Sequence, residues 1–209
     1  MNKERVGEII KLLSREYPDA RVALEHKNPF QLLIATILSA QSTDVQINKI
    51  TKTLFKKYKG PEDFADAHIE EIENDIKSSG FYRNKAKNIQ NTCKILVNDF
   101  NSDVPRTMEG LIKLSGVARK TANIVLSGGY GIVEGIPVDT HVKRLSQRLG
   151  LTDNSDPNKI ERDLMEIVPK SEWFHISDML IFHGRTVCDA RRPKHDRCVL
   201  YNLCHSRDI

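Results

Sequence analysis

Residues 111–140 read LIKLSGVARKTANIVLSGGYGIVEGIPVDT, and this stretch predicts two short helices joined by a tight turn. Leu111 and Leu114 have the spacing of a helix end, and Gly116 can adopt backbone conformations that other residues resist. A second helical pattern begins at Arg119, so that the backbone N–H groups of its first turn form a site for an anion. On nucleic acid such a hairpin would hold a phosphate, which fixes position without reading sequence.

Two ionisable residues accompany this hairpin. Lys120 falls in the first turn of the second helix, where the macrodipole disfavours a cation, and Arg119 adds like charge. Both influences favour a neutral amine, which is a nucleophile. Asp139 precedes a helix predicted over Thr140–Leu149 and can accept backbone N–H bonds there. Singly, these residues are typical of a surface charge and a helix cap; with a phosphate-binding hairpin, they indicate chemistry on a sugar–phosphate backbone.

The strings LSGVARKTA at 114–122 and VDTHV at 138–142 resemble the helix–hairpin–helix motif of the endonuclease III family of DNA glycosylases. In that family the lysine is the Schiff-base nucleophile and the aspartate is its partner, so the resemblance assigns these catalytic roles to Lys120 and Asp139. Gly116 and Ala118 would contact DNA. The sequence departs from the family at Ser115, usually Pro, and at Ala118, often Gly. We therefore expect that Ala118 does not need a positive φ.

Composition places the chain among soluble globular proteins. Its 209 residues are 39% hydrophobic and 29% charged, and a net charge of +4 is compatible with nucleic acid. The N-terminal residues lack the apolar region of a signal peptide, and no apolar run reaches membrane-spanning length. We therefore expect a cytoplasmic protein that does not bind membranes, in which cysteines are thiols or metal ligands.

Helical periodicity extends over nearly every segment, which predicts an all-α protein. Phe30–Ala40 is apolar almost all round and should lie at the centre of a bundle, and Lys85, Lys87 and Lys94 are expected on the polar side of their helix. Apart from the hairpin, the predicted helices are an N-terminal one through Val6 and Leu13, then Phe30–Ala40, one that begins after Ser42-Thr43-Asp44, then Pro61–Ala67, Ile69–Ser79, Lys85–Phe100, Thr140–Leu149, Ile160–Ile167 and Trp173–Val187.

The resemblance covers essentially the whole chain and implies two α-helical lobes. Residues 20–133 would form a helical-barrel lobe that contains the hairpin. Residues 1–19 and 134–209 would form the other lobe, which ends in a metal-cluster loop. The resemblance also implies a monomer that binds DNA across a cleft, with Lys120 and Asp139 on opposite sides.

Two junctions between helices match family elements that enter DNA. The string LSAQSTD at 38–44 matches a motif whose glutamine fills the space left by an extruded base, a role that would fall on Gln41. Phe81 stands where the family carries an apolar wedge that unstacks the duplex. Without the resemblance, the first junction reads as a helix cap and Phe81 as a core residue.

Cys188, Cys198 and Cys204 crowd into the C-terminal segment, which indicates a soft-metal site. With His195 the spacing is Cys-x6-His-x2-Cys-x5-Cys. The family's iron–sulfur loop has Cys-x6-Cys-x2-Cys-x5-Cys, so His195 replaces its second cysteine. The resemblance favours a [4Fe-4S] cluster with these residues as ligands; a Cys₃His zinc site, or no metal, remains open.

Basic residues lie within the same loop. Arg191, Arg192 and Lys194 fall between Cys188 and His195 and are candidates for contacts with DNA phosphates. Any one of them could equally be a solvated surface charge. The fourth cysteine, Cys93, falls within a helix and is expected to be a buried thiol.

The leading hypothesis is therefore a bifunctional DNA glycosylase and AP lyase. It would remove oxidised pyrimidines from double-stranded DNA through a Schiff base on Lys120 and nick abasic sites by β-elimination. One alternative is a monofunctional mismatch glycosylase, which would not need an amine at this position. Another is a non-catalytic helix–hairpin–helix module, which would not require Lys120 and Asp139 together. An adenine glycosylase is disfavoured because Ala35 stands where its glutamate is expected.

Overall fold

The structure, a computed structural model, describes residues 3–20 and 24–206. These residues form helices and connecting segments without a strand, so the predicted all-α fold is confirmed. The chain divides into two compact units: one comprises Met1–Val22 and Gly135–Ile209, the other Ala23–Glu134. In the part of the chain that is described, no helix is long and apolar enough to cross a membrane.

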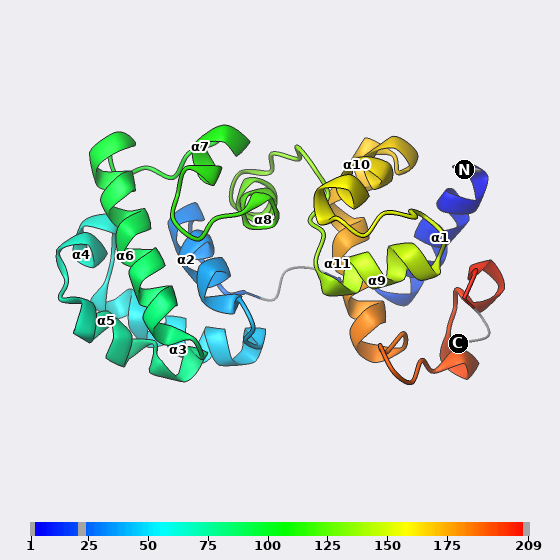
Figure 1. Ribbon diagram of the computed structural model, residues 1–209, viewed down its shortest axis with the longest axis horizontal. Helices are drawn as coiled ribbons and strands as arrows, with labels where there is room; N and C mark the ends of the chain where they lie inside the picture. The colour runs from blue at the N-terminus through cyan, green and yellow to red at the C-terminus, as the bar shows by residue number, and fades with distance from the viewer. Residues whose placement is uncertain (1–2, 21–23, 207–209) are drawn as a thin grey trace. The chain divides into compact units, whose positions relative to one another are not determined.

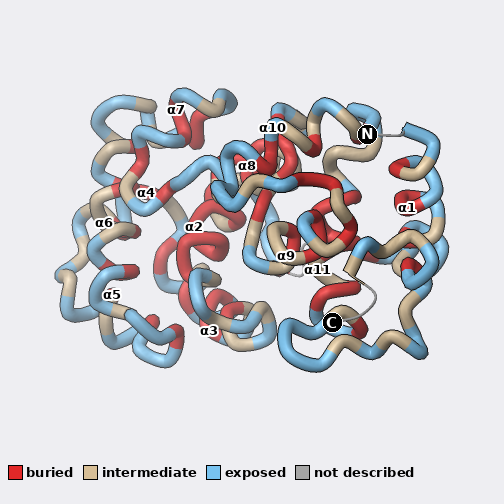
Figure 2. Tube along the Cα trace, turned by 45° about the vertical axis from the view of Figure 1, so that its right-hand side comes forward, coloured by how far each residue is buried: buried red, intermediate tan, exposed pale blue. Residues whose placement is uncertain are grey.

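Helix α2 (Pro29–Ser39) is the centre of the unit formed by Ala23–Glu134. It begins at Asn28, whose side chain accepts a hydrogen bond from the backbone of Gln31, and Pro29 follows as the first helical residue. The helix packs against α3 (Asp44–Lys57), α6 (Tyr82–Asp99) and α8 (Arg119–Tyr130) (Figure 1). Figure 2 shows it buried along most of its length, as its apolar sequence predicts.

Smaller elements cover the outside of this unit. Helix α4 (Pro61–Asp66) and helix α5 (Ile69–Asp75) pack on α6, and helix α7 (Met108–Ile112) packs on α8. The sequence predicted one helix from Ile69 to Ser79, and this is wrong. The buried Ile76 leaves the helical conformation, and a 3₁₀ turn η1 (Lys77–Ser79) follows.

Helix α8 continues through Gly128 and Gly129. It runs to Tyr130 and ends at Gly131, which has a φ of 67°. A Cβ atom on Gly128 would lie 2.8 Å from Cδ2 of Leu32, and one on Gly129 would lie 3.1 Å from Cβ of Pro29. The glycines therefore remain helical and let α8 approach α2 closely.

The other unit contains α1 (Lys3–Glu16), α9 (Thr140–Arg148), α10 (Pro157–Ile167), the 3₁₀ turn η2 (Lys170–Glu172), α11 (Trp173–Thr186) and the short turns η3 (His195–Arg197) and η4 (Tyr201–Leu203). Helix α11 packs against α1 and α9, and α10 packs against α9 (Figure 1). Helix α10 begins three residues before its prediction because Asp156 caps it, accepting from the backbone of Asn158 and Lys159. The core is apolar and includes Ile9, Leu13, Ile136, Val142, Leu145, Ile160, Leu164, Met179, Leu180 and Leu200.

Candidate nucleic-acid interface and metal centre

The hairpin predicted from residues 111–140 is formed by α7 and α8, and α6 holds its turn. Thr92 donates a hydrogen bond from Oγ1 to the carbonyl oxygen of Ser115 over 2.8 Å. Ser115 in turn donates from Oγ to Oδ1 of Asn88 over 3.1 Å. Serine thus replaces the family's usual proline and contributes a hydrogen bond that proline would lack. Two polar residues of α6, Asn88 and Thr92, therefore hold the turn in place.

Gly116 and Ala118 set the path of the chain into α8. Gly116 has a φ of 74°, a conformation that favours glycine. Ala118 has a φ of −92°, so the expectation that it needs no positive φ is confirmed. Ala118 caps α8 and its side chain makes no hydrogen bond to the helix start. The positive end of the helix dipole is therefore not compensated by a capping side chain, which suits an anion.

Lys120 and Asp139 belong to different units, and each stands at a helix start. Lys120 is an exposed residue in the first turn of α8. Asp139 is partly buried and caps α9, its Oδ1 atom accepting from the backbone N–H groups of His141 and Val142, both over 2.8 Å. The capping role considered for Asp139 from the sequence is therefore real.

Gln41 and Phe81 share an unusual backbone conformation. Gln41 follows α2 with a φ of 55°, and Phe81 precedes α6 with a φ of 48°. Both side chains are exposed, Phe81 to 67%. An exposed phenylalanine is not a core residue, so that alternative for Phe81 is wrong. Left-handed conformations at non-glycine residues cost about 1–2 kcal/mol each and cluster at functional sites.

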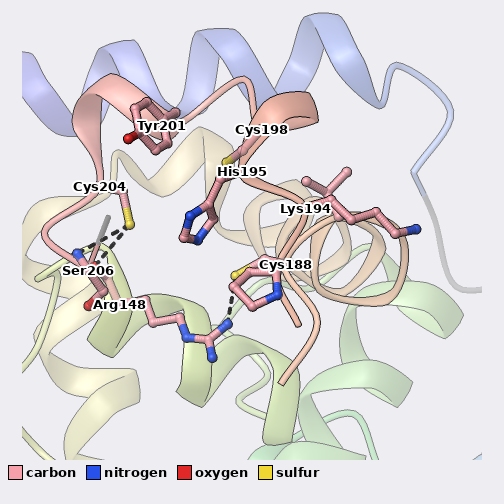
Figure 3. A pocket seen from close by; sticks show the side chains of 10 residues that line it. Arg148, Cys188, Lys194, His195, Cys198, Tyr201, Cys204 and Ser206 are labelled. Carbon is pink, nitrogen blue, oxygen red and sulfur yellow. Dashed lines mark hydrogen bonds between the residues drawn. The ribbon is translucent and has the colours of Figure 1, made fainter. Parts of the chain in front are cut away.

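The C-terminal loop brings its candidate ligands together. Cys188, His195, Cys198 and Cys204 all line one cavity, and Figure 3 shows their side chains directed into the same space (Figure 3). Across residues 3–20 and 24–206, no three His, Cys, Asp or Glu side chains lie close enough together to hold a single metal ion.

Hydrogen-bond donors face two of the three cysteine sulfur atoms of this loop. Arg148 of α9 donates from Nη1 to Sγ of Cys188 over 3.2 Å, and the backbone N–H of Ser206 donates to Sγ of Cys204 over 3.4 Å. Sγ of Cys198 lies 3.4 Å from Nε2 of His183. Donors aimed at sulfur are suited to stabilising thiolates, the form in which cysteine binds metal.

His183 is not a surface residue of α11. Burial lowers its pKa to about 4, so that the imidazole is neutral at pH 7. The hydroxyl of Tyr17 lies 3.0 Å from its Nδ1 atom, on the side of the ring opposite Cys198. The sequence pattern gives no indication of this contact between His183 and a candidate metal ligand, because His183 lies outside the spacing of the C-terminal cysteines.

The chain is similar to known proteins over nearly its whole length. The sequence model described as HhH-GPD superfamily base excision DNA repair protein matches residues 34–170, and that described as the iron-sulfur binding domain of endonuclease III matches residues 188–204. Endonuclease III of Synechocystis sp. is 52% identical over 204 residues, which cover 98% of this chain and 93% of that protein. Endonuclease III of Bacillus subtilis is 46% identical over 205 residues, which cover 98% of this chain and 93% of that protein. A solved non-covalent Endonuclease III–DNA complex matches with a TM-score of 0.94 and 45% identity, covering 99% of this chain and 97% of that one.

The chain belongs to the endonuclease III family. It is accordingly a DNA glycosylase of base excision repair with AP-lyase activity, the enzyme class that the sequence predicted. Its cofactor is a [4Fe-4S] cluster.

The residues of the loop fit the cofactor of the endonuclease III family. Three cysteines and one imidazole face one cavity, and both ligand types bind iron in iron–sulfur clusters. The site residues predicted from the sequence do not include Arg148. The feature that could have indicated it is a basic residue on α9 whose side chain faces the cysteine loop.

Basic residues of the loop divide into two kinds. Arg191 and Arg192 have exposed side chains, while their backbone N–H groups donate to Oδ1 of Asp189 over 2.9 and 3.1 Å. The ammonium of Lys194 donates to the carbonyl oxygen of Thr186 over 2.9 Å, at the end of α11. Lys194 therefore has a structural contact in addition to any contact with DNA, and all three remain predictions as phosphate ligands.

Proposed function

We propose that the enzyme removes oxidised pyrimidines from double-stranded DNA and cleaves abasic sites, with Lys120 as the nucleophile. The observation that carries this proposal is the position of Lys120: exposed, in the first turn of α8, two residues after the uncapped helix start at Ala118. A phosphate held by that helix start would bring the neighbouring deoxyribose to the amine. Gly116 and Ala118 would contribute backbone to this phosphate site.

The proposed chemistry starts at C1′ of the damaged nucleotide. Nζ of Lys120 attacks C1′ as the bond from C1′ to the base breaks, and the base leaves with the electron pair of that bond. Loss of a proton from nitrogen and ring opening give a Schiff base. Removal of a proton from C2′ then breaks the C3′–O bond, which nicks the strand, and water releases Lys120. The mechanism requires that Asp139 reach the same sugar, where its carboxylate stabilises positive charge and assists proton transfers.

Two further residues would act on the duplex. Gln41 is proposed to fill the space left by the extruded nucleotide, and Phe81 to unstack the adjacent bases. Their exposed, left-handed positions at two turns of one unit support this assignment. The cluster would be held by Cys188, His195, Cys198 and Cys204 and would stabilise the loop. We place the enzyme in the cytoplasm, as a monomer acting on DNA.

Borohydride trapping on duplex DNA with an abasic site tests the proposal. The wild-type enzyme should form a covalent adduct, because borohydride reduces a Schiff base to a stable amine. Lys120→Ala should lose trapping and strand cleavage while it retains DNA binding. Lys113→Ala is the matched control, since Lys113 is an exposed lysine of the same hairpin, and it should trap like the wild type. Excision without any adduct in the wild type would indicate a monofunctional glycosylase; trapping by Lys120→Ala would move the nucleophile elsewhere.

A further inference from the structure

Lys85, near the start of α6, connects the two turns that carry Gln41 and Phe81. Its predicted place on the polar side of the helix is wrong: it is only 4% exposed. Its ammonium donates to the carbonyl oxygen of Ser79 over 2.7 Å and to Oγ of Ser42 over 3.2 Å. Ser42 follows Gln41 directly, and Ser79 precedes Phe81 by two residues. One buried side chain therefore binds both turns.

The two partners of Lys85 also bind each other. The hydroxyl of Ser42 donates to the carbonyl oxygen of Ser79, so that Lys85, Ser42 and Ser79 form a closed set of hydrogen bonds. The backbone N–H of Ser42 donates to Ser39 at the end of α2 over 3.0 Å. The set therefore ties the end of α2 to the end of η1, although these segments are far apart in sequence.

Stability alone gives a poor reason for a buried ammonium here. Both hydrogen-bond partners of Lys85 are neutral oxygen atoms, and burial lowers the pKa of Lys85. Burial of a charge is costly, and replacement of a buried charged group by an apolar one of similar volume is often neutral or stabilising. The presence of a buried ammonium is better explained by the two turns, at Ser42 and Ser79, that it holds in place.

Those positions are strained. Gln41 and Phe81 hold left-handed backbone conformations that persist only where the surrounding structure enforces them. Lys85 contacts Ser42, one residue after Gln41, and Ser79, two residues before Phe81. Lys85 thus contacts both strained turns at once and reinforces the direct hydrogen bond from Ser42 to Ser79.

We propose that Lys85 is a positioning residue for nucleotide extrusion, which joins the Gln41 turn to the Phe81 turn so that both side chains enter the duplex as one unit. This inference rests on the proposed function, in which Gln41 fills the gap and Phe81 unstacks the bases. It separates duplex opening from chemistry. A single-stranded abasic site needs no unstacking, so its cleavage does not depend on Lys85.

The test compares Lys85→Met with Lys94→Met, which removes an exposed lysine from the same helix. Single-turnover cleavage is measured on an abasic site in duplex and in single-stranded DNA. Loss of a hydrogen-bonded charge predicts that Lys85→Met is slower on duplex by about tenfold or more, with its single-strand rate and melting temperature maintained. Lys94→Met should match the wild type on both substrates. Equal losses on the two substrates, or an unchanged duplex rate, would overturn the inference.

Amide hydrogen exchange provides a readout that does not depend on activity. In folded Lys85→Met, exchange should accelerate in both turns, residues 40–43 and 79–82, and unchanged exchange in either would overturn the inference. If Lys85→Met does not fold, Ser42→Ala removes one partner and should show a smaller loss restricted to duplex; a wild-type duplex rate would again overturn it. A wild-type enzyme that forms no adduct on duplex abasic DNA would instead contradict the proposed function, a result distinct from any of these.

Discussion

Nδ2 of Asn88 lies 2.7 Å from the position that a Cβ atom on Gly116 would occupy. A side chain at position 116 is therefore disfavoured for two reasons: it would contact Asn88, and the φ of 74° at Gly116 favours glycine. Because Asn88 also accepts a hydrogen bond from Ser115, it cannot move away without loosening the turn.

Gly116→Ala should destabilise the protein and weaken its binding to DNA. Backbone strain alone accounts for about 1–2 kcal/mol, and displacement of Asn88 adds to it. Thermal denaturation and affinity for undamaged duplex measure the two effects. Gly7→Ala is the control, because Gly7 lies within α1 with no neighbour within 4 Å of an added Cβ, and it should be as stable as the wild type or more so. A Gly116→Ala variant with wild-type stability and affinity would show that the hairpin tolerates another path.

Much of this fold could be predicted from the sequence. The features that could not be predicted depend on contacts between elements. The periodicity of apolar residues located α1, because one buried face is enough to determine a helix, and a nearly continuous apolar run located α2. Lys85 was placed wrongly, since only the folded chain brings the carbonyl oxygen of Ser79 to its ammonium. The positive φ of Gln41 is likewise set by neighbouring turns. Gly116 was identified correctly because its requirement is local.

Arg191 and Arg192 should contribute to the salt dependence of DNA binding. If each contacts one phosphate, Arg191→Ala or Arg192→Ala should reduce the slope of log affinity against log salt by about one unit, through counterion release. Affinity for a duplex is measured at several salt concentrations. Arg162→Ala removes an exposed arginine of α10, outside the C-terminal loop, and serves as the control. A slope equal to that of the wild type would assign the arginines to solvated surface charge.

Ligation by His195 should change how the cluster behaves. With Cys188, His195, Cys198 and Cys204 as ligands, protein purified without oxygen should be brown and contain roughly four irons per chain. Neutral imidazole in place of a thiolate makes the cluster less negative, which raises its reduction potential relative to an all-cysteine site. His195→Cys should therefore lower the potential and slow cluster loss.

Metal analysis decides between the ligand sets at this loop. A colourless protein with one tightly bound zinc per chain would contradict the cluster assignment. A His195→Cys variant with the same potential and the same rate of iron loss as the wild type would show that His195 is not a ligand. His195→Cys should leave the Schiff-base chemistry of Lys120 unaltered once iron is bound.

His141 should make stability sensitive to acid. Burial lowers the pKa of His141 below its usual value of 6.5, and its ring faces Arg144. A base with a lowered folded pKa contributes stability that is complete above the unfolded pKa and is lost as pH falls through the folded pKa. The melting temperature should therefore drop below about pH 6.5, and His141→Gln should reduce that drop. Parallel pH profiles for the two proteins would contradict this assignment.

The most direct measurement is the identity of the residue that carries the sugar after borohydride reduction. Wild-type enzyme is trapped on abasic DNA, digested with nuclease and protease, and the modified peptide is sequenced by mass spectrometry. The account predicts that the adduct lies on Nζ of Lys120, at the start of α8. An adduct on any other lysine or on the N-terminal amine, with Lys120 unmodified, would contradict it.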